Sequence, residues 1–159
     1  MACVSIATLF IKKGVGRPRP NYAALVEVVA QSPALAAGSA GALGGHPRTS
    51  FPSAHSSHAM AAFGFFALVV WGDAARRVGP LWARNLAGMV ALLSMACAIW
   101  VGMTRIQDYW HHPDDVFAGW ALGALCAKIG YAAQSTAAHD EPAAAGSDVQ
   151  LLMSPMHKV

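Results

Sequence analysis

The chain has 159 residues, of which 55% are hydrophobic and only 12% charged, and its formal net charge is +3. Soluble domains carry about 25% charged residues, so this composition leaves too little charge to cover a water-facing surface and indicates an integral membrane protein. The basic residues are not interleaved with aromatic ones, which excludes a nucleic-acid surface. Three cysteines without CxxC spacing argue against a disulfide framework or a zinc site.

Four apolar segments predict an all-α, polytopic membrane helix bundle. The first, residues 1–11, is followed by Lys12 and Lys13, the reverse of the order in a signal peptide. We therefore expect it to be the end of a membrane helix whose beginning is missing. A spanning helix needs about 20 mostly apolar residues, and this predicts three further helices over residues 53–72, 86–103 and 114–133.

The segments between these helices are more polar. Residues 14–51 are rich in Gly, Pro, Ala and Ser and predict a loop, in which Tyr22 to Gln31 is compatible with one interfacial turn or short helix. Residues 134–159 are aperiodic, so we expect a disordered tail after a membrane core over residues 1–133.

The predicted helices bring distant polar residues to one membrane face. These residues are Lys12, Arg19, His55, Arg105, His111 and Asp115. The opposite face carries Arg76, Arg77 and Arg84 on a short connection, which indicates the cytoplasmic side. The first face has more basic residues by raw count, but we discount those that would bind substrate. The composite site is then expected on the lumenal or extracellular face.

The chemistry of this residue set fits phosphoryl transfer. Arg and Lys hold phosphate oxygens, and a turn that opens a helix at Pro52 to His55 presents backbone N–H groups to an anion. His111 and Asp115 are four residues apart, which places them on one helix face. A neutral His111 is then a candidate nucleophile oriented by Asp115, and His55 a candidate general acid.

Two other interpretations of these residues are open. A basic cluster at the end of a membrane helix is commonly an interfacial anchor. A second cluster, His111, His112, Asp114 and Asp115, has side chains that bind zinc or another divalent ion. The surrounding cations disfavour a metal and favour phosphate.

Three motifs in order resemble the type 2 phosphatidic acid phosphatase superfamily, the lipid phosphate phosphatases. Its signatures are K-x6-RP, PSGH and SR-x5-H-x3-D. The chain has Lys12 with Arg19–Pro20, then Pro52-Ser53-Ala54-His55, and then Arg105, His111 and Asp115 at the third spacing.

This resemblance implies a role for each matched residue. His111 would form a phosphohistidine, His55 would be the general acid and Asp115 would orient His111. The phosphate would be bound by Lys12, Arg19 and Arg105, together with Ser53 and the backbone near Ala54. The resemblance implies no metal and no cofactor.

The chain departs from the family pattern in three ways. Ala54 replaces Gly, Thr104 replaces Ser, and three helices with part of a fourth stand in place of a six-helix bundle. We therefore expect an N-terminally truncated phosphatase that acts on a membrane lipid phosphate monoester of the phosphatidate type. The alternatives are a catalytically silent binding protein, or a phosphatase for a polyprenyl diphosphate or sugar phosphate. The sequence names neither the lipid nor the oligomeric state.

Overall fold

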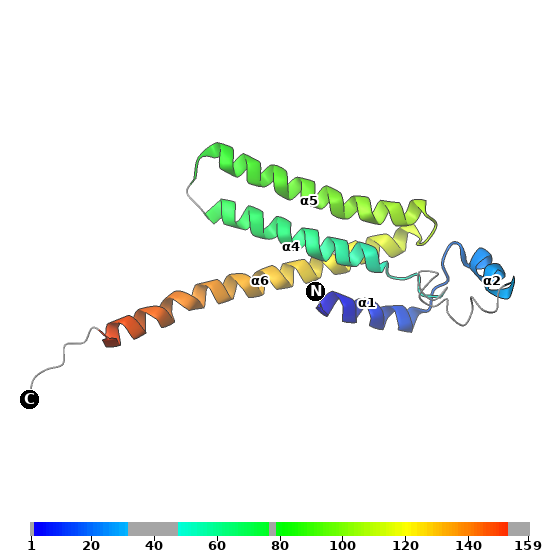
Figure 1. The fold of residues 1–159 in the computed structure, drawn as a ribbon, viewed down its shortest axis with the longest axis horizontal. Helices are drawn as coiled ribbons and strands as arrows, with labels where there is room; N and C mark the ends of the chain where they lie inside the picture. The colour runs from blue at the N-terminus through cyan, green and yellow to red at the C-terminus, as the bar shows by residue number, and fades with distance from the viewer. Residues whose placement is uncertain (1, 32–47, 77–78, 153–159) are drawn as a thin grey trace, which may run out of the picture.

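The structure is a computed structural model that describes residues 2–31, 48–76 and 79–152. Over these ranges it contains no strand and consists of helices α1 (Ala2–Val15), α2 (Tyr22–Gln31), α4 (Ala54–Arg76), α5 (Leu81–Gln107) and α6 (Pro113–Leu152). Helices α4, α5 and α6 lie side by side, and α1 packs against α4 and α6 (Figure 1). Of the two alternatives for Tyr22 to Gln31, a turn or a short helix, the structure has the helix, α2, which lies beyond the end of the bundle.

Three of these helices are long and apolar enough to cross a membrane. They are Ala54–Arg76, Leu81–Gln107 and the Pro113–Thr136 part of α6, with mean hydropathies of 1.4, 2.1 and 1.4. This confirms the predicted all-α membrane bundle and its three later spans, although each helix extends beyond the predicted limits. Helix α1 has 14 residues, too few to span a bilayer alone.

The prediction of a disordered tail from residue 134 is wrong as far as Leu152, because α6 continues to that residue. The segment is rich in alanine, the residue with the highest intrinsic helix propensity. Intrinsic helix propensity does not depend on apolar periodicity, so the aperiodic pattern did not indicate this helix. The end of the predicted tail, residues 153–159, lies outside the described residues.

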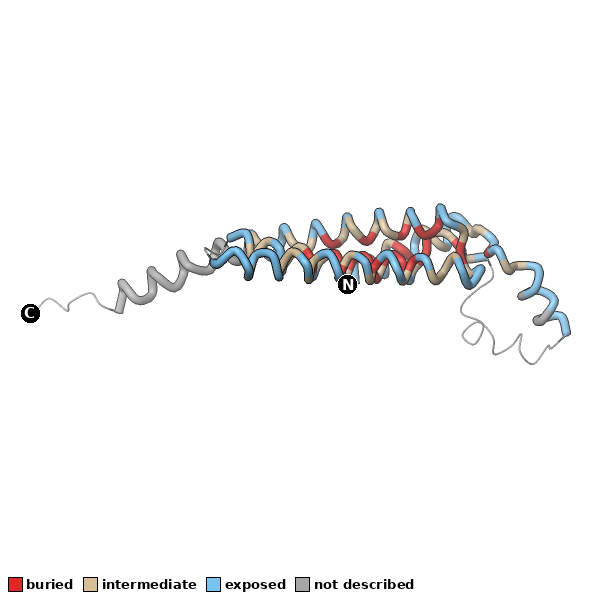
Figure 2. Tube along the Cα trace, turned by 90° about the horizontal axis from the view of Figure 1, so that it is seen from above, coloured by how far each residue is buried: buried red, intermediate tan, exposed pale blue. Residues whose placement is uncertain are grey.

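The interior of the bundle is built from small and polar side chains. Ser50, Ser53, Ser56 and Ser57 are completely buried, whereas Phe10 is 81% exposed and Leu92 73% exposed. Figure 2 shows the buried residues gathered on the inner helix faces, in the half of the bundle next to α2. Helices that pack in lipid have this pattern, with large apolar residues outside and small residues inside. In lipid the helices associate through close packing of their backbones and not through the burial of apolar surface from water.

Polar bonds between helices hold this interior together. Thr8 Oγ1 of α1 lies 3.1 Å from Ser57 Oγ of α4. Ser94 Oγ of α5 donates to the carbonyl oxygen of Phe63 in α4 at 2.8 Å. Such bonds satisfy groups that would otherwise be unpaired away from water, and they fix the rotation of α1 and α5 relative to α4.

Candidate active site

A cavity of about 440 Å³ is lined by residues from the ends of several helices. These helix ends meet at the end of the bundle next to α2 (Figure 1). Lys12 comes from the last turn of α1, His55 from the first turn of α4 and Arg105 from the last turn of α5. The structure therefore brings together six of the eight predicted site residues. The full lining is Lys12, Arg19, Thr49, Ala54, His55, Arg105, Trp110 and His111.

The turn after α5 places His111 beside Arg105. The Arg105 carbonyl accepts hydrogen bonds from the backbone N–H groups of Trp110 at 3.1 Å and His111 at 3.2 Å. Tyr109, with a φ of 56°, donates its N–H to Ile106 at 3.0 Å. The bond from Trp110 to Arg105 and the bond from Tyr109 to Ile106 together form a Schellman motif. Tyr109 occupies its left-handed position, which usually holds glycine. The turn reverses the chain within a few residues, so both groups face the same cavity.

The side chain of Asp115 caps the N-terminus of α6. Pro113 occupies the first helical position, where its missing N–H costs nothing. Asp115 Oδ2 reaches back to accept the backbone N–H of His112 at 2.8 Å, as the third-position acid does in a capping box. The side chain of Asp115 is fully buried directly behind His111, outside the cavity lining.

Both oxygens of the Asp115 carboxylate have further partners. Arg17 Nη1 lies 2.9 Å from Oδ1 and also pairs with Asp114. Ser50 Oγ donates to Oδ2 at 2.5 Å, and His112 Nδ1 lies 3.2 Å from the same oxygen. Since a buried carboxylate is costly unless it is paired and hydrogen-bonded, these donors explain how Asp115 stays in the interior.

His111 is only 4% exposed, and its environment favours the neutral imidazole. Burial, followed by the charges of Lys12 and Arg19, lowers its pKa to about 4; Asp115 and a backbone hydrogen bond with Ser50 act in the opposite direction. Nδ1 lies 3.8 Å from Asp115 Oδ2 and 3.4 Å from Ser50 Oγ. The contact expected between His111 and Asp115 is thus longer than a hydrogen bond.

Two cations on the loop side of the cavity are held by specific contacts. Lys12 Nζ donates to the carbonyl oxygen of Thr49 at 2.6 Å. Burial, helped by the charge of Arg19 and opposed by Asp115, lowers the pKa of Lys12 to about 8. The Arg19 guanidinium lies 5.0 Å from the centroid of the Trp110 ring, a cation–π distance, and Arg19 is only 7% exposed.

The third cation comes from α5. Arg105 Nε and Nη2 each lie 3.2 Å from Thr104 Oγ1, and Nη2 lies 3.0 Å from Asp108 Oδ2. The hydroxyl at position 104 therefore orients the guanidinium, which gives a physical reason why threonine can stand where the family pattern has serine.

The start of α4 completes the cavity. Ser53 Oγ accepts the backbone N–H of Ser56 at 3.4 Å, the bond of a helix cap, and the Ser56 hydroxyl at 2.9 Å. Ser53 is fully buried and is not among the residues that line the cavity. Ala54 is the first residue of α4, and helical φ suits alanine as well as glycine. The first N–H groups of a helix have no intrahelical acceptor and can bind an anion.

Four contributors to this site were not predicted from the sequence: Arg17, Thr49, Ser50 and Trp110. Arg17 lies in the same Gly-Arg-Pro-Arg-Pro run as Arg19, and its pairing with Asp114 and Asp115 became visible only in the fold. Ser50 precedes Phe51–Pro52, and no local spacing marks it. Its position follows from a backbone bond of its N–H to the Arg17 carbonyl, at 3.0 Å.

The metal alternative fits this arrangement poorly. Arg17 pairs with both Asp114 and Asp115, the carboxylates that such a site would need. Within the described ranges, no group of three His, Cys, Asp or Glu side chains is placed to hold an ion.

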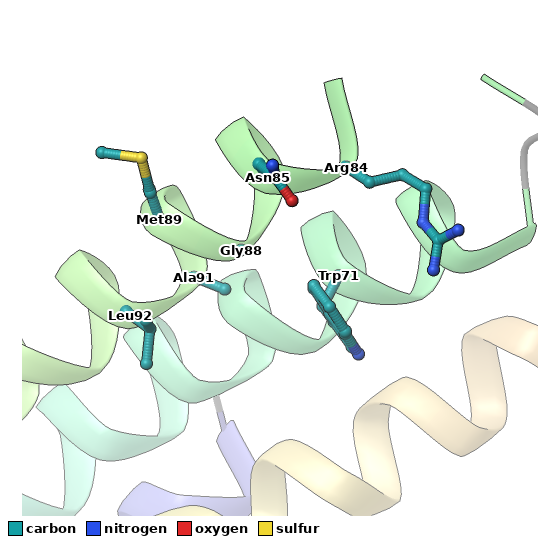
Figure 3. A pocket seen from close by; sticks show the side chains of 7 residues that line it. All are labelled: Trp71, Arg84, Asn85, Gly88, Met89, Ala91 and Leu92. Carbon is teal, nitrogen blue, oxygen red and sulfur yellow. The ribbon is translucent and has the colours of Figure 1, made fainter. Parts of the chain in front are cut away.

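A second cavity, of about 460 Å³, lies at the opposite ends of α4 and α5 (Figure 3). Among the residues that the structure describes, its lining has no histidine or carboxylate, and Arg84 is the one charged side chain, so these residues lack the groups for phosphoryl chemistry. Its lining is Trp71, Arg84, Asn85, Gly88, Met89, Ala91 and Leu92.

A family model described as the PAP2 superfamily matches residues 1–138. Over 143 residues the chain is 36% identical to lipid phosphate phosphatase 1 of Arabidopsis thaliana, covering 79% of this chain and 39% of that protein. It is 36% identical to human phospholipid phosphatase 2, covering 72% and 41%. It is 34% identical to lipid A 1-phosphatase of Rhizobium johnstonii, covering 72% and 36%. No solved structure gives a significant match. The chain spans about two fifths of the length of these relatives.

Proposed function

This chain belongs to the PAP2 superfamily, and from that membership we propose that it is an integral membrane phosphatase for a lipid phosphate monoester. The observation that carries the proposal is one cavity that combines a buried histidine of lowered pKa, His111, with three cations, Lys12, Arg19 and Arg105. A phosphoryl-transfer transition state requires chiefly charge stabilisation and an aligned nucleophile.

The proposed reaction has two steps. The phosphate oxygens are held by three cations, Lys12, Arg19 and Arg105, and by the first backbone N–H groups of α4 near Ala54. Ser53 contributes by accepting the backbone N–H of Ser56, which fixes the start of that helix. His111 Nε2 forms a bond to phosphorus while the bond to the ester oxygen breaks, and a protonated His55 gives its proton to the departing alcohol. Neutral His55 then takes a proton from water, which attacks the phosphohistidine and releases phosphate and His111. No metal or cofactor takes part in these steps.

A lipid substrate is supported by the position of the cavity. It lies at one end of a bundle of three helices long enough to cross a membrane, the level at which a lipid phosphate sits. Two relatives bear the names lipid phosphate phosphatase and phospholipid phosphatase, which supports a phosphatidate-type substrate. Another is named lipid A 1-phosphatase, which makes phosphorylated lipid A the second candidate. Arg76 and Arg84, at the other end of the bundle, support a lumenal or extracellular site.

The deciding experiment traps the intermediate. Purified protein in lipid nanodiscs is mixed with ³²P-labelled phosphatidate and quenched in base, which preserves phosphohistidine, and the label is then released with acid. Wild type is expected to carry the label and turn over the lipid, and His111→Ala to do neither. Turnover that persists in His111→Ala would refute the proposed nucleophile. A wild-type chain that binds lipid phosphate but neither traps nor releases it would identify the silent binding protein instead.

Metal independence is tested in the same assay. Activity is expected to survive EDTA and to be inhibited by vanadate, a phosphate mimic. Loss of activity with EDTA and its recovery with zinc or magnesium would favour the metal alternative.

A further inference from the structure

We propose that Ser50 is a positioning residue whose hydroxyl links His111 to Asp115 and keeps the His111 proton on Nδ1, leaving Nε2 as the attacking atom. This inference rests on the proposed function, since it assigns the cause of the nucleophile's reactivity. Neither the matched motifs nor the predicted site residues include Ser50.

The distances place the serine between the other two groups. Ser50 Oγ lies 2.5 Å from Asp115 Oδ2 and 3.4 Å from His111 Nδ1, whereas His111 and Asp115 are 3.8 Å apart. The 3.4 Å distance exceeds the usual range for an N–H donor. Catalytic hydrogen bonds are often this long before substrate binds. All three side chains are buried, with Ser50 and Asp115 fully so.

A count of protons then determines the tautomer. A serine hydroxyl has one proton to donate and lone pairs with which to accept. The short bond to Asp115 commits that proton, because an ionised carboxylate can only accept. Toward His111, Ser50 can therefore only accept, so Nδ1 must carry the hydrogen. A neutral imidazole has a single N–H, and Nε2 is left with its lone pair.

The other partners of Asp115 keep its carboxylate from bonding to His111 Nδ1 in place of the Ser50 hydroxyl. Oδ1 is held by Arg17 at 2.9 Å, and Oδ2 also accepts the backbone N–H of His112 at 2.8 Å. Ser50 itself is held by its own N–H, which donates to the Arg17 carbonyl at 3.0 Å. Arg17 thus holds both Asp115 and Ser50 in place. The negative charge of the Asp115 carboxylate then acts on His111 through the Ser50 hydroxyl.

The tautomer is measured directly by ¹⁵N NMR of histidine-labelled full chain in nanodiscs at pH 7, where protonated and unprotonated ring nitrogens differ in shift. The His111 signal is assigned by its disappearance in His111→Gln. Wild type is expected to show the proton on Nδ1. Ser50→Ala and Ser50→Cys are expected to shift part or all of it to Nε2; cysteine preserves side-chain volume, so a packing defect in the alanine variant would not decide the result.

Kinetics give the second measurement. Both Ser50 variants are expected to lower kcat by about 10- to 100-fold, the range for outer partners that orient a ligand histidine, with a smaller change in KM. The control is Ser94→Ala, which removes another buried serine bond, between Ser94 and Phe63, away from the cavity. It is expected to change neither kcat nor the tautomer.

The outcomes separate the two proposals. An unchanged Nδ1 proton in a folded Ser50→Cys variant would overturn the role of the hydroxyl and assign the tautomer to the backbone of Ser50, which also bonds to His111. A tautomer shift in a chain without lipid phosphatase turnover would uphold the linkage and refute the proposed function. Turnover that resists both Ser50 substitutions would overturn the linkage and leave the proposed function intact.

Discussion

Gly119 of α6 packs against the backbone of Ser53: a Cβ atom at Gly119 would lie 2.7 Å from the Ser53 carbonyl oxygen. Four residues on, a Cβ at Gly123 would lie 2.8 Å from Met60 Cβ and 2.9 Å from Ala61 N. This small-xxx-small spacing lets α4 and α6 approach closely, as in membrane helix pairs. It also sets the separation between the start of α4, which carries His55, and the start of α6, which follows His111.

Gly119→Ala should therefore damage both stability and the site. The added methyl meets backbone atoms that cannot rotate away, and overpacking of this kind costs about 1–3 kcal/mol. We expect a lower midpoint of thermal unfolding in detergent and weaker binding of vanadate. Gly130→Ala in the same helix is the control, since its nearest atom is Phe65 at 3.5 Å, an ordinary contact. If both substitutions had the same effect, close approach at Gly119 would not be the cause.

His55→Ala should slow the reaction in a way that depends on the leaving group. General acid catalysis is worth about 10²–10⁴-fold, because an alkoxide is a poor leaving group without a proton. We expect a loss of this size with phosphatidate and a much smaller loss with p-nitrophenyl phosphate, whose phenolate leaves readily. Equal losses with both substrates would assign His55 to phosphate binding instead of proton transfer.

The pH dependence of kcat/KM should have an acid limit set by His111 and an alkaline decline set by His55 and Lys12. His55 must be protonated to act as the general acid, so its loss of a proton contributes to the decline. His111 must be neutral, and since its pKa is lowered to about 4, activity should be retained at pH 5 and lost as pH falls through about 4. Lys12 must be charged, and since its pKa is lowered to about 8, activity should fall as pH rises through about 8. Both His111 and Lys12 face Arg19 and Asp115.

Lys12→Arg isolates the contribution of Lys12 to the alkaline decline, because arginine keeps its charge throughout the accessible range. The variant should lose the part of the decline that lies near pH 8. The ratio of variant to wild-type kcat/KM at each pH cancels the titration of the substrate phosphate. A flat ratio across pH 7–10 would show that Lys12 does not cause the decline.

Tyr109 should tolerate glycine and reject a β-branched residue. Its φ of 56° is unfavourable for a residue with a Cβ, by about 1–2 kcal/mol, and its side chain is 71% exposed, so little packing is lost on truncation. Tyr109→Gly should keep or raise the unfolding midpoint, whereas Tyr109→Val should lower it and reduce turnover by displacing His111 relative to Arg105. The reverse order of stabilities would contradict the turn geometry.

The sequence predicted more of the residues that gather at the candidate site than of the fold around them. The spacing of Lys12 to Arg19 and of Arg105 to Asp115 is local, and helix periodicity with bilayer length was enough to place these segments at one end of the bundle. The extension of α6 to Leu152 was missed because this alanine-rich segment has no apolar stripe that periodicity could detect.

The residues themselves determined an all-α membrane protein, the set of cations and histidines, and the order of the motifs, because hydropathy and spacing are properties of the chain alone. Only the tertiary structure decided which of these groups touch. Arg17 pairs with Asp115 across 98 positions, and Ser50 enters between His111 and Asp115 across 61 and 65. Such contacts depend on how closely α4 and α6 approach and on where Arg17 and Ser50 lie relative to the start of α6. Neither property produces a periodic pattern in the sequence.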